Sequence, residues 1–147
     1  MNDIEIEKAQ NLDEGTVTDI QRLHSQVSSS RAPSTDEISS IASNPGTTLL
    51  IARERGGSRA VIGMLSVVSF RIPSGLRVWI EDVVVDKTAR RRGIGEALNR
   101  AAIDYASSLG ARTIDLTSRP SRTAANQLYL KLGFERRETN VYRLTLK

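Results

Sequence analysis

Apolar positions recur along this chain with two different periods, and the periods predict its elements. Alternation of apolar and polar residues is typical of strands, whereas apolar residues three or four apart are typical of helices. The strand pattern covers residues 4–8, 48–53, 60–72, 77–85, 113–117, 134–137 and 140–146. The helix pattern covers residues 13–28, 34–44, 93–109 and 122–132. This order of elements predicts a mixed α/β (α+β) protein.

Local signals at the ends of the predicted helices support the same elements. Asp13 is placed to cap the first helix, and Ser34 with Glu37 forms a capping box for the second. Gly110 and Gly133 follow the last two helices, where glycine commonly ends a helix in the left-handed conformation.

Length and composition predict one domain, residues 1–147, without an internal repeat. The chain has no cysteine, which excludes disulfides and thiolate chemistry. No apolar run reaches the ~20 residues of a membrane span, and the charged N-terminus argues against a signal peptide. We therefore expect no membrane association and a cytoplasmic location. The net charge of +4 is modest, and aromatic residues are too few for a base-stacking surface, so nucleic acid is not the expected partner.

The most informative stretch is residues 83–98, where a run of β-branched residues leads through a basic loop into a helix. Glycines at a helix start allow a ligand to approach the backbone, and the N–H groups there favour an anion. The three arginines of residues 90–92 suit phosphate oxygens. A Walker loop is excluded because Glu96 and Ala97 follow Gly95, and a dinucleotide fingerprint is excluded because Leu98 replaces its third glycine.

Two motifs together carry a family resemblance. Residues 90–95 read Arg-x-x-Gly-x-Gly, and residues 125–134 read Ala-x-x-Leu-Tyr-x-x-x-Gly-Phe. They resemble the pyrophosphate loop and the second conserved segment of the GNAT superfamily of acetyl-CoA-dependent N-acetyltransferases. The resemblance covers roughly the C-terminal half of the chain. It implies a mixed, mostly antiparallel central sheet of about six to seven strands flanked by about four helices.

The resemblance also implies acetyl-CoA as the acyl-donor cosubstrate, without a metal. The residues that match cofactor-binding positions of the family are Val83, Val84, Val85, Arg90, Arg91, Arg92, Gly93, Ile94, Gly95, Glu96, Asn126 and Tyr129. Within residues 83–85, a bulge in the strand is expected to expose the backbone N–H of Val84 or Val85 to the acetyl oxygen. Arg122 stands where the family often has asparagine, and Asn126, one turn later, is a candidate to replace it.

Two side chains are candidates for acid–base catalysis. Glu81 matches a position that often holds a glutamate in the family, and burial on its strand would raise its pKa toward neutrality. Neighbouring strand residues face opposite ways, so only one of Glu81 and Asp82 is expected to face the site. Asp82 or a water are alternative bases, and pairing of one carboxylate with Arg77 is the purely structural alternative. Tyr129 matches the family tyrosine that can protonate the leaving thiolate.

Other residues give little signal. His24, the only histidine, is expected at the surface, and no metal cluster is apparent. Tyr142 could line the acceptor pocket or fill the last predicted strand. The acceptor is expected to be a primary amine, of a small molecule or a protein, that attacks acetyl-CoA directly. A CoA-binding regulatory domain without catalysis and a basic nucleic-acid-binding domain are the alternatives. Homodimers are common in the family, so a homodimer is one expectation.

Overall fold

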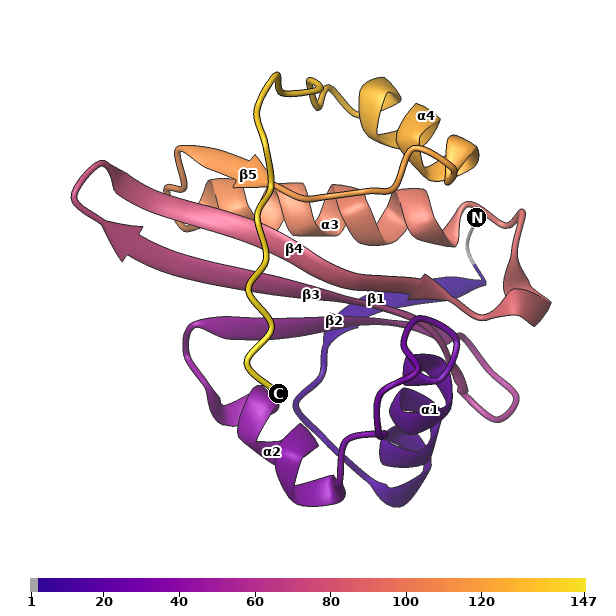
Figure 1. Ribbon diagram of the computed structural model, residues 1–147. Coiled ribbons are helices and arrows are strands. Elements are labelled where there is room, and N and C mark those ends of the chain that lie inside the picture. The colour runs from indigo at the N-terminus through magenta and orange to yellow at the C-terminus, as the bar shows by residue number, and fades with distance from the viewer. Residues whose placement is uncertain (1–2) are drawn as a thin grey trace. The chain divides into compact units, whose positions relative to one another are not determined.

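The computed structural model describes residues 3–147 and contains five strands, four α-helices and one 3₁₀ turn in this range. The elements in chain order are β1 (Ile4–Lys8), α1 (Glu14–His24), α2 (Thr35–Ser43), β2 (Thr47–Glu54), β3 (Val61–Ile72), β4 (Gly75–Val85), η1 (Lys87–Ala89), α3 (Ile94–Ser108), β5 (Thr113–Asp115) and α4 (Thr123–Lys131) (Figure 1). The chain divides into two compact units, Met1–Leu116 and Thr117–Lys147. None of these helices is both long and apolar enough to cross a membrane.

The first unit is a five-stranded sheet in the order β1-β2-β3-β4-β5. Neighbouring strands are antiparallel except β4 and β5, which run parallel over Arg77–Trp79 and Thr113–Asp115. Helices α1 and α2 lie on one face of the sheet, and α3 lies on the other (Figure 1). The mixed, mostly antiparallel sheet flanked by helices confirms the predicted fold class.

The starts of α1 and α2 follow their sequence signals, because a capping side chain accepts from N–H groups that the helix itself leaves without a partner. Asp13 accepts from the Thr16 N–H at 2.8 Å. In the capping box, Ser34 Oγ accepts from the Glu37 N–H at 3.1 Å, and the Glu37 carboxylate accepts from the Ser34 N–H at 2.9 Å. Both predicted caps are therefore confirmed.

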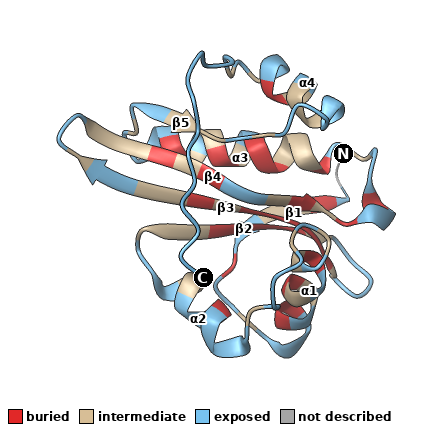
Figure 2. Cartoon of the chain, viewed as in Figure 1, coloured by how far each residue is buried: buried red, intermediate tan, exposed pale blue. Residues whose placement is uncertain are grey.

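The core between the sheet and helices α1 and α2 consists of buried aliphatic residues from both layers (Figure 2). Its members are Ala9, Val17, Ile20, Leu23, Ile38, Leu49, Ile51, Val61, Met64 and Val84. On the opposite face, α3 packs closely on β3 at Gly63. A Cβ there would lie 3.0 Å from Ile94 Cγ2 and 3.3 Å from the Val84 carbonyl oxygen.

This close packing makes Gly63→Ala a test of the α3–β3 interface. The methyl group would push α3 from the sheet, so we expect the free energy of unfolding to fall by about 1–3 kcal/mol. Urea denaturation measures the change. In the control Gly15→Ala, the nearest atom to the new Cβ is Asp13 Oδ1 at 3.7 Å, so that variant should be neutral or more stable. Equal stability of Gly63→Ala and the parent would contradict the packing.

The sheet has fewer strands than the six to seven expected, and this part of the prediction is wrong. Residues 134–137 and 140–146 form no strand, and residues 132–147 contain no helix or strand. The segment 140–146 does alternate, but its large apolar side chains are exposed, for example Tyr142 at 87% and Leu144 at 84%. Alternation predicts a strand only where a neighbouring strand supplies hydrogen bonds and a surface to cover.

Candidate active site

Strand β4 contains a β-bulge beside its two carboxylates. The register with β3 shifts by one residue between Glu81 and Val84. Asp82 and Val83 therefore both lie opposite Leu65. Asp82 takes up the irregularity with a φ of 50°, in the left-handed region. The bulge begins one residue before the segment 83–85 in which the sequence predicted it.

Beyond the bulge, one edge of β4 is open. The Asp86 N–H donates to the Ile62 carbonyl at 2.8 Å, across to β3. Successive N–H groups of a strand point to opposite edges, so the Val85 N–H points away from β3. Strand β5 pairs with β4 only over Arg77–Trp79, and no other strand of residues 3–147 pairs with this edge. The Val85 N–H is therefore a candidate hydrogen-bond donor to a ligand.

Glu81 lies on the face of the sheet that α1 and α2 cover farther along. It pairs with Ser66, which shares its side of β3 with the core residue Met64. Trp79 lies two residues earlier on the same face, and its Nε1–H donates to Glu81 Oε2 at 2.5 Å. Glu81 is exposed rather than buried, so the expected burial was wrong. The indole fixes the direction of the carboxylate.

The predicted alternative role of the two carboxylates, an ion pair with Arg77, is not found. Arg77 Nη2 donates to Ser74 Oγ at 3.4 Å. The ion pairs of residues 3–147 include neither Glu81 nor Asp82. Two exposed carboxylates thus flank the start of the bulge.

The loop between β4 and α3 ends in an open helix N-terminus. Gly93 is the N-cap residue, with φ of 76° and ψ of 15°, and no side chain caps the helix. The intrahelical bonds begin with the Ala97 N–H donating to the Gly93 carbonyl at 3.0 Å. Within the helix, the N–H groups of Ile94 and Gly95 have no carbonyl four residues back to bind. Such a terminus attracts anions.

The three arginines of the loop differ in their surroundings. The Arg92 guanidinium donates to Glu54 Oε2 at 3.2 Å and to Asp3 Oδ2 at 2.5 Å. Both bonds raise the pKa of Arg92, and the bond to Glu54 contributes more than the bond to Asp3. Arg90 and Arg91 are exposed and make none of the ion pairs of residues 3–147. Arg92 therefore braces the loop, while Arg90 and Arg91 remain available to a ligand.

These residues fit the pyrophosphate of acetyl-CoA. A Cβ on Gly93 would meet no atom within 4 Å, so there is open space at the helix start. Helix N–H groups and exposed arginine side chains are the donors that phosphate sites use. The fit agrees with the comparison of the whole chain with known families. Residues 16–134 match the sequence profile of the Acetyltransferase (GNAT) family.

The chain belongs to this GNAT family. The family uses acetyl-CoA, and the match runs through both compact units.

Curated relatives agree over shorter stretches. An uncharacterized N-acetyltransferase of Methanocaldococcus jannaschii is 41% identical over 59 residues, which are 40% of this chain and 26% of the relative. A mycothiol acetyltransferase of Amycolatopsis mediterranei is 44% identical over 59 residues, 40% of this chain and 20% of the relative. The uncharacterized N-acetyltransferase YhdJ of Bacillus subtilis is 35% identical over 82 residues, 55% of this chain and 56% of the relative. The chain thus spans about half or less of the length of these relatives.

Solved structures match the chain nearly end to end. An acetyltransferase of Trypanosoma brucei superposes with a TM-score of 0.81 and 25% identity, covering 98% of this chain and 100% of the other. An aminoglycoside acetyltransferase from a soil metagenome has a TM-score of 0.84 at 18% identity, covering 99% of this chain and 98% of the other. The second likeness shows a shared fold alone.

The second GNAT motif lies on and after α4. Tyr129 is buried and packs edge-on against Phe134, with ring centroids 5.8 Å apart. Burial raises the pKa of Tyr129, an effect that Arg122 partly offsets. Asn126, the expected substitute for the family asparagine, donates through Nδ2 to the Arg119 and Arg122 carbonyls at 2.9 and 2.8 Å. Its side-chain donor is thus used within the start of its own helix.

The structure also places two residues whose sequence context carried little signal. His24 Nε2 lies 3.2 Å from Ser30 Oγ, and the imidazole is half-buried rather than at the open surface. Tyr142 is 87% exposed. Residues 3–147 contain no cluster of three or more His, Cys, Asp or Glu that could hold a metal.

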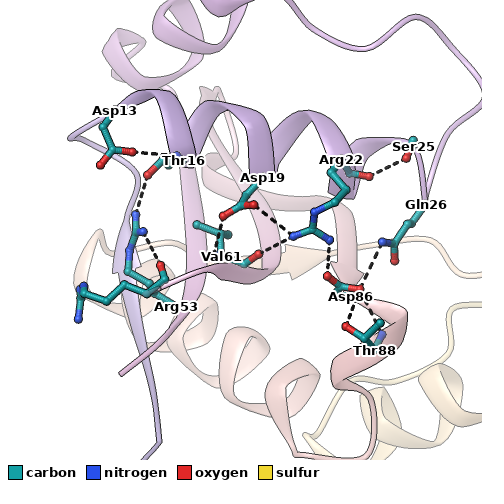
Figure 3. Close-up of polar contacts among 11 residues, drawn as sticks. Asp13, Thr16, Asp19, Arg22, Ser25, Gln26, Arg53, Val61, Asp86 and Thr88 are labelled. Atoms are coloured by element: carbon teal, nitrogen blue, oxygen red, sulfur yellow. Dashed lines mark hydrogen bonds and ion pairs between the residues drawn. The ribbon is translucent and has the colours of Figure 1, made fainter. Parts of the chain in front are cut away.

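The sequence pattern did not predict the polar cluster at the start of the loop between β4 and α3 (Figure 3). This loop, residues 86–93, is called the phosphate loop below. Asp86 is buried, and its carboxylate accepts from Arg22, from Gln26 and from both donors of Thr88. Burial alone would raise the pKa of Asp86, but the Thr88 N–H and Arg22 outweigh it and keep the pKa below its usual range. The only local signal was an Asp-x-Thr sequence, which is typical of a turn cap.

Proposed function

We propose that this chain is an acetyl-CoA-dependent N-acetyltransferase in which a primary amine attacks the acetyl carbonyl directly. The observation that carries the proposal is the uncapped N-terminus of α3, which follows a bulged strand and stands beside Arg90 and Arg91. The family match supports the reaction class. The match runs from residue 16 to residue 134, which also supports one acetyltransferase domain over residues 1–147.

The cofactor-binding roles follow from the loop. We assign the pyrophosphate to the N–H groups of the segment 91–96 and to the side chains of Arg90 and Arg91. Arg92 is assigned a bracing role, because Asp3 and Glu54 already bind it. The Val85 N–H is assigned to the acetyl oxygen. That oxygen gains negative charge when the amine attacks, and an oriented backbone donor stabilises this charge.

Glu81 is assigned the base. The attacking amine must lose a proton, and a carboxylate accepts it directly or through a water. The bond from Trp79 orients Glu81, and its exposure gives an incoming amine access. Its carboxylate makes none of the ion pairs of residues 3–147, and its negative charge favours an acceptor arriving as an ammonium ion. The nitrogen–carbon bond then forms, the carbon–sulfur bond breaks, and the sulfur leaves as a thiolate.

Tyr129 is assigned the acid that protonates this thiolate. A tyrosine phenol is protonated at neutral pH, which is the state that a proton donor needs, and burial shifts the pKa of Tyr129 further in the same direction. We expect Tyr129→Phe to lower kcat by about 100-fold and to leave the Kd of acetyl-CoA unchanged. Initial rates and calorimetry measure the two quantities. The matched control is Tyr142→Phe, an exposed tyrosine that should keep full kcat. An unchanged kcat in Tyr129→Phe would remove this role.

An acceptor screen tests the reaction itself. The protein and acetyl-CoA are mixed with polyamines, amino acids, aminoglycosides and peptides that carry an N-terminal or lysine amine. Because the chain has no cysteine, a thiol reagent reports only the CoA released. Mass spectrometry of the amine confirms a gain of one acetyl group. Acetylation of at least one amine class above the uncatalysed rate supports the enzyme. Tight acetyl-CoA binding without transfer to any class would instead favour a CoA-binding regulatory domain.

A further inference from the structure

The phosphate loop begins at a point that is tied to helix α1. Asp86 directly follows β4, is 6% exposed, and leads through η1 into the loop. Its Oδ1 accepts from the Thr88 N–H and Oγ1, each at 3.1 Å, and so closes the first turn of the loop. Its Oδ2 forms an ion pair with Arg22 Nη1 on α1, 64 residues earlier in the chain.

Arg22 does not bind Asp86 alone. Its Nη2 donates to the Val61 carbonyl at 3.1 Å, while Asp19, one turn earlier, accepts from the Val61 N–H at 3.0 Å. Arg22 and Asp19 also pair with each other at 3.4 Å. The guanidinium is therefore held at the first residue of β3, and its other nitrogen is directed at Asp86 (Figure 3).

Gln26 makes a second connection just after α1. Its Nε2 donates to Asp86 Oδ1 at 3.4 Å, and its Oε1 accepts from the Lys87 N–H at 3.0 Å. One amide thus binds both the side chain of Asp86 and the backbone of the next residue. Neither Arg22 nor Gln26 belongs to the residues assigned to acetyl-CoA.

We propose that Arg22 and Gln26 are positioning residues, which hold the start of the phosphate loop through Asp86 in the arrangement that binds acetyl-CoA. At its other end the loop is already held by Arg92 on Asp3 and Glu54. On either side of Arg92, Arg91 and Gly93 both occupy the left-handed region, with φ of 65° and 76°. A short loop with such a backbone keeps one conformation only if its ends are fixed.

The expected effect on acetyl-CoA affinity follows from the fraction of molecules whose loop is in the binding arrangement. If only a fraction of molecules has the loop in its binding arrangement, the apparent Kd rises by the inverse of that fraction. Loss of Arg22 leaves the buried Asp86 carboxylate with weaker partners, so the loop at this end is free to rearrange. We expect Arg22→Met to raise the Kd of acetyl-CoA about tenfold, and Gln26→Met about threefold. Saturating acetyl-CoA should restore kcat, so the effect should appear in KM for acetyl-CoA.

The test rests on the proposed function and is designed to separate the two. Calorimetry gives the Kd of acetyl-CoA for the parent, Arg22→Met, Gln26→Met and the control Asp19→Ala, and thermal unfolding gives the Tm of each. Asp19→Ala removes the acceptor of the Val61 N–H and the ion pair with Arg22, but none of the bonds to Asp86. It should lower the Tm as Arg22→Met does, with the Kd changed less than about twofold.

The outcomes are distinct. Weaker binding in Arg22→Met and Gln26→Met, with Asp19→Ala unaffected, supports positioning of the loop. A lowered Tm with the parent Kd in both variants would show that the cluster serves stability only, and it would overturn the inference. Should Arg22→Met fail to fold, Gln26→Met decides alone, because Gln26 lies outside α1 and the core. If the parent itself binds no acetyl-CoA, the proposed function fails first.

Discussion

Gly93→Val is expected to abolish measurable acetyl-CoA binding, with an affinity loss of more than about 100-fold. The φ of 76° at Gly93 strains any β-branched residue, at a cost of about 1–3 kcal/mol if the backbone holds. If the backbone moves instead, the N–H groups at the start of α3 lose their alignment. In either case the valine side chain enters the open space in which the pyrophosphate is proposed to bind. Calorimetry with acetyl-CoA measures the loss.

The chain offers a matched control for this variant. Gly56, in the turn between β2 and β3, has a φ of 82°, and a Cβ there also meets no atom within 4 Å. Gly56→Val therefore carries a similar backbone strain at a distance from the loop in sequence and should lose similar stability. It should bind acetyl-CoA as the parent does. Equal affinity of Gly93→Val and Gly56→Val would contradict the assignment of the loop.

Glu81→Gln is expected to lower kcat by about 100- to 10,000-fold, the usual contribution of a general base. The amide is nearly the same size and can still accept the Trp79 bond, so the Kd of acetyl-CoA should not change. Steady-state rates with the best acceptor from the screen, together with calorimetry, measure the two effects. A combined loss of rate and cofactor binding would point to a structural role.

Asp82→Asn is the matched control for the base. Asparagine tolerates the left-handed backbone that Asp82 adopts, so the bulge should persist. We expect this variant to keep kcat within a few-fold of the parent. If Asp82→Asn loses the activity and Glu81→Gln keeps it, the two carboxylates exchange roles. If neither changes kcat, a water without a carboxylate partner must take the proton.

The fold was predictable where the deciding interactions are local. Ser34 and Glu37 cap their helix across three residues, and Gly93 begins α3 next to its own loop, so neighbouring positions in the sequence contained the information. The strand pattern of residues 140–146 is equally local. A strand also needs a partner, however, and a pattern of side chains does not say whether one is present.

The motif of the site was predictable from the sequence, but the contacts that its residues make with distant parts of the chain were not. The Arg-x-x-Gly-x-Gly pattern located the loop, but it gave the three arginines the same role. Arg92 is distinguished by carboxylates 38 and 89 residues away in the chain, at Glu54 and Asp3. Likewise, Asp86 acquires its role from Arg22, and only the folded chain brings these residues together. The exposure of Glu81 also depends on which helices reach its part of the sheet.

The central claim is that the start of α3 binds the pyrophosphate of acetyl-CoA, and one set of titrations tests it most directly. The parent protein is titrated by calorimetry with acetyl-CoA, with CoA and with S-acetylpantetheine, which lacks the pyrophosphate and the nucleotide. We predict saturable binding of acetyl-CoA and CoA at one site per chain, and binding of S-acetylpantetheine weaker by about 100-fold or more. Absence of heat and of any Tm change with acetyl-CoA, or equal affinity for S-acetylpantetheine, would contradict the account.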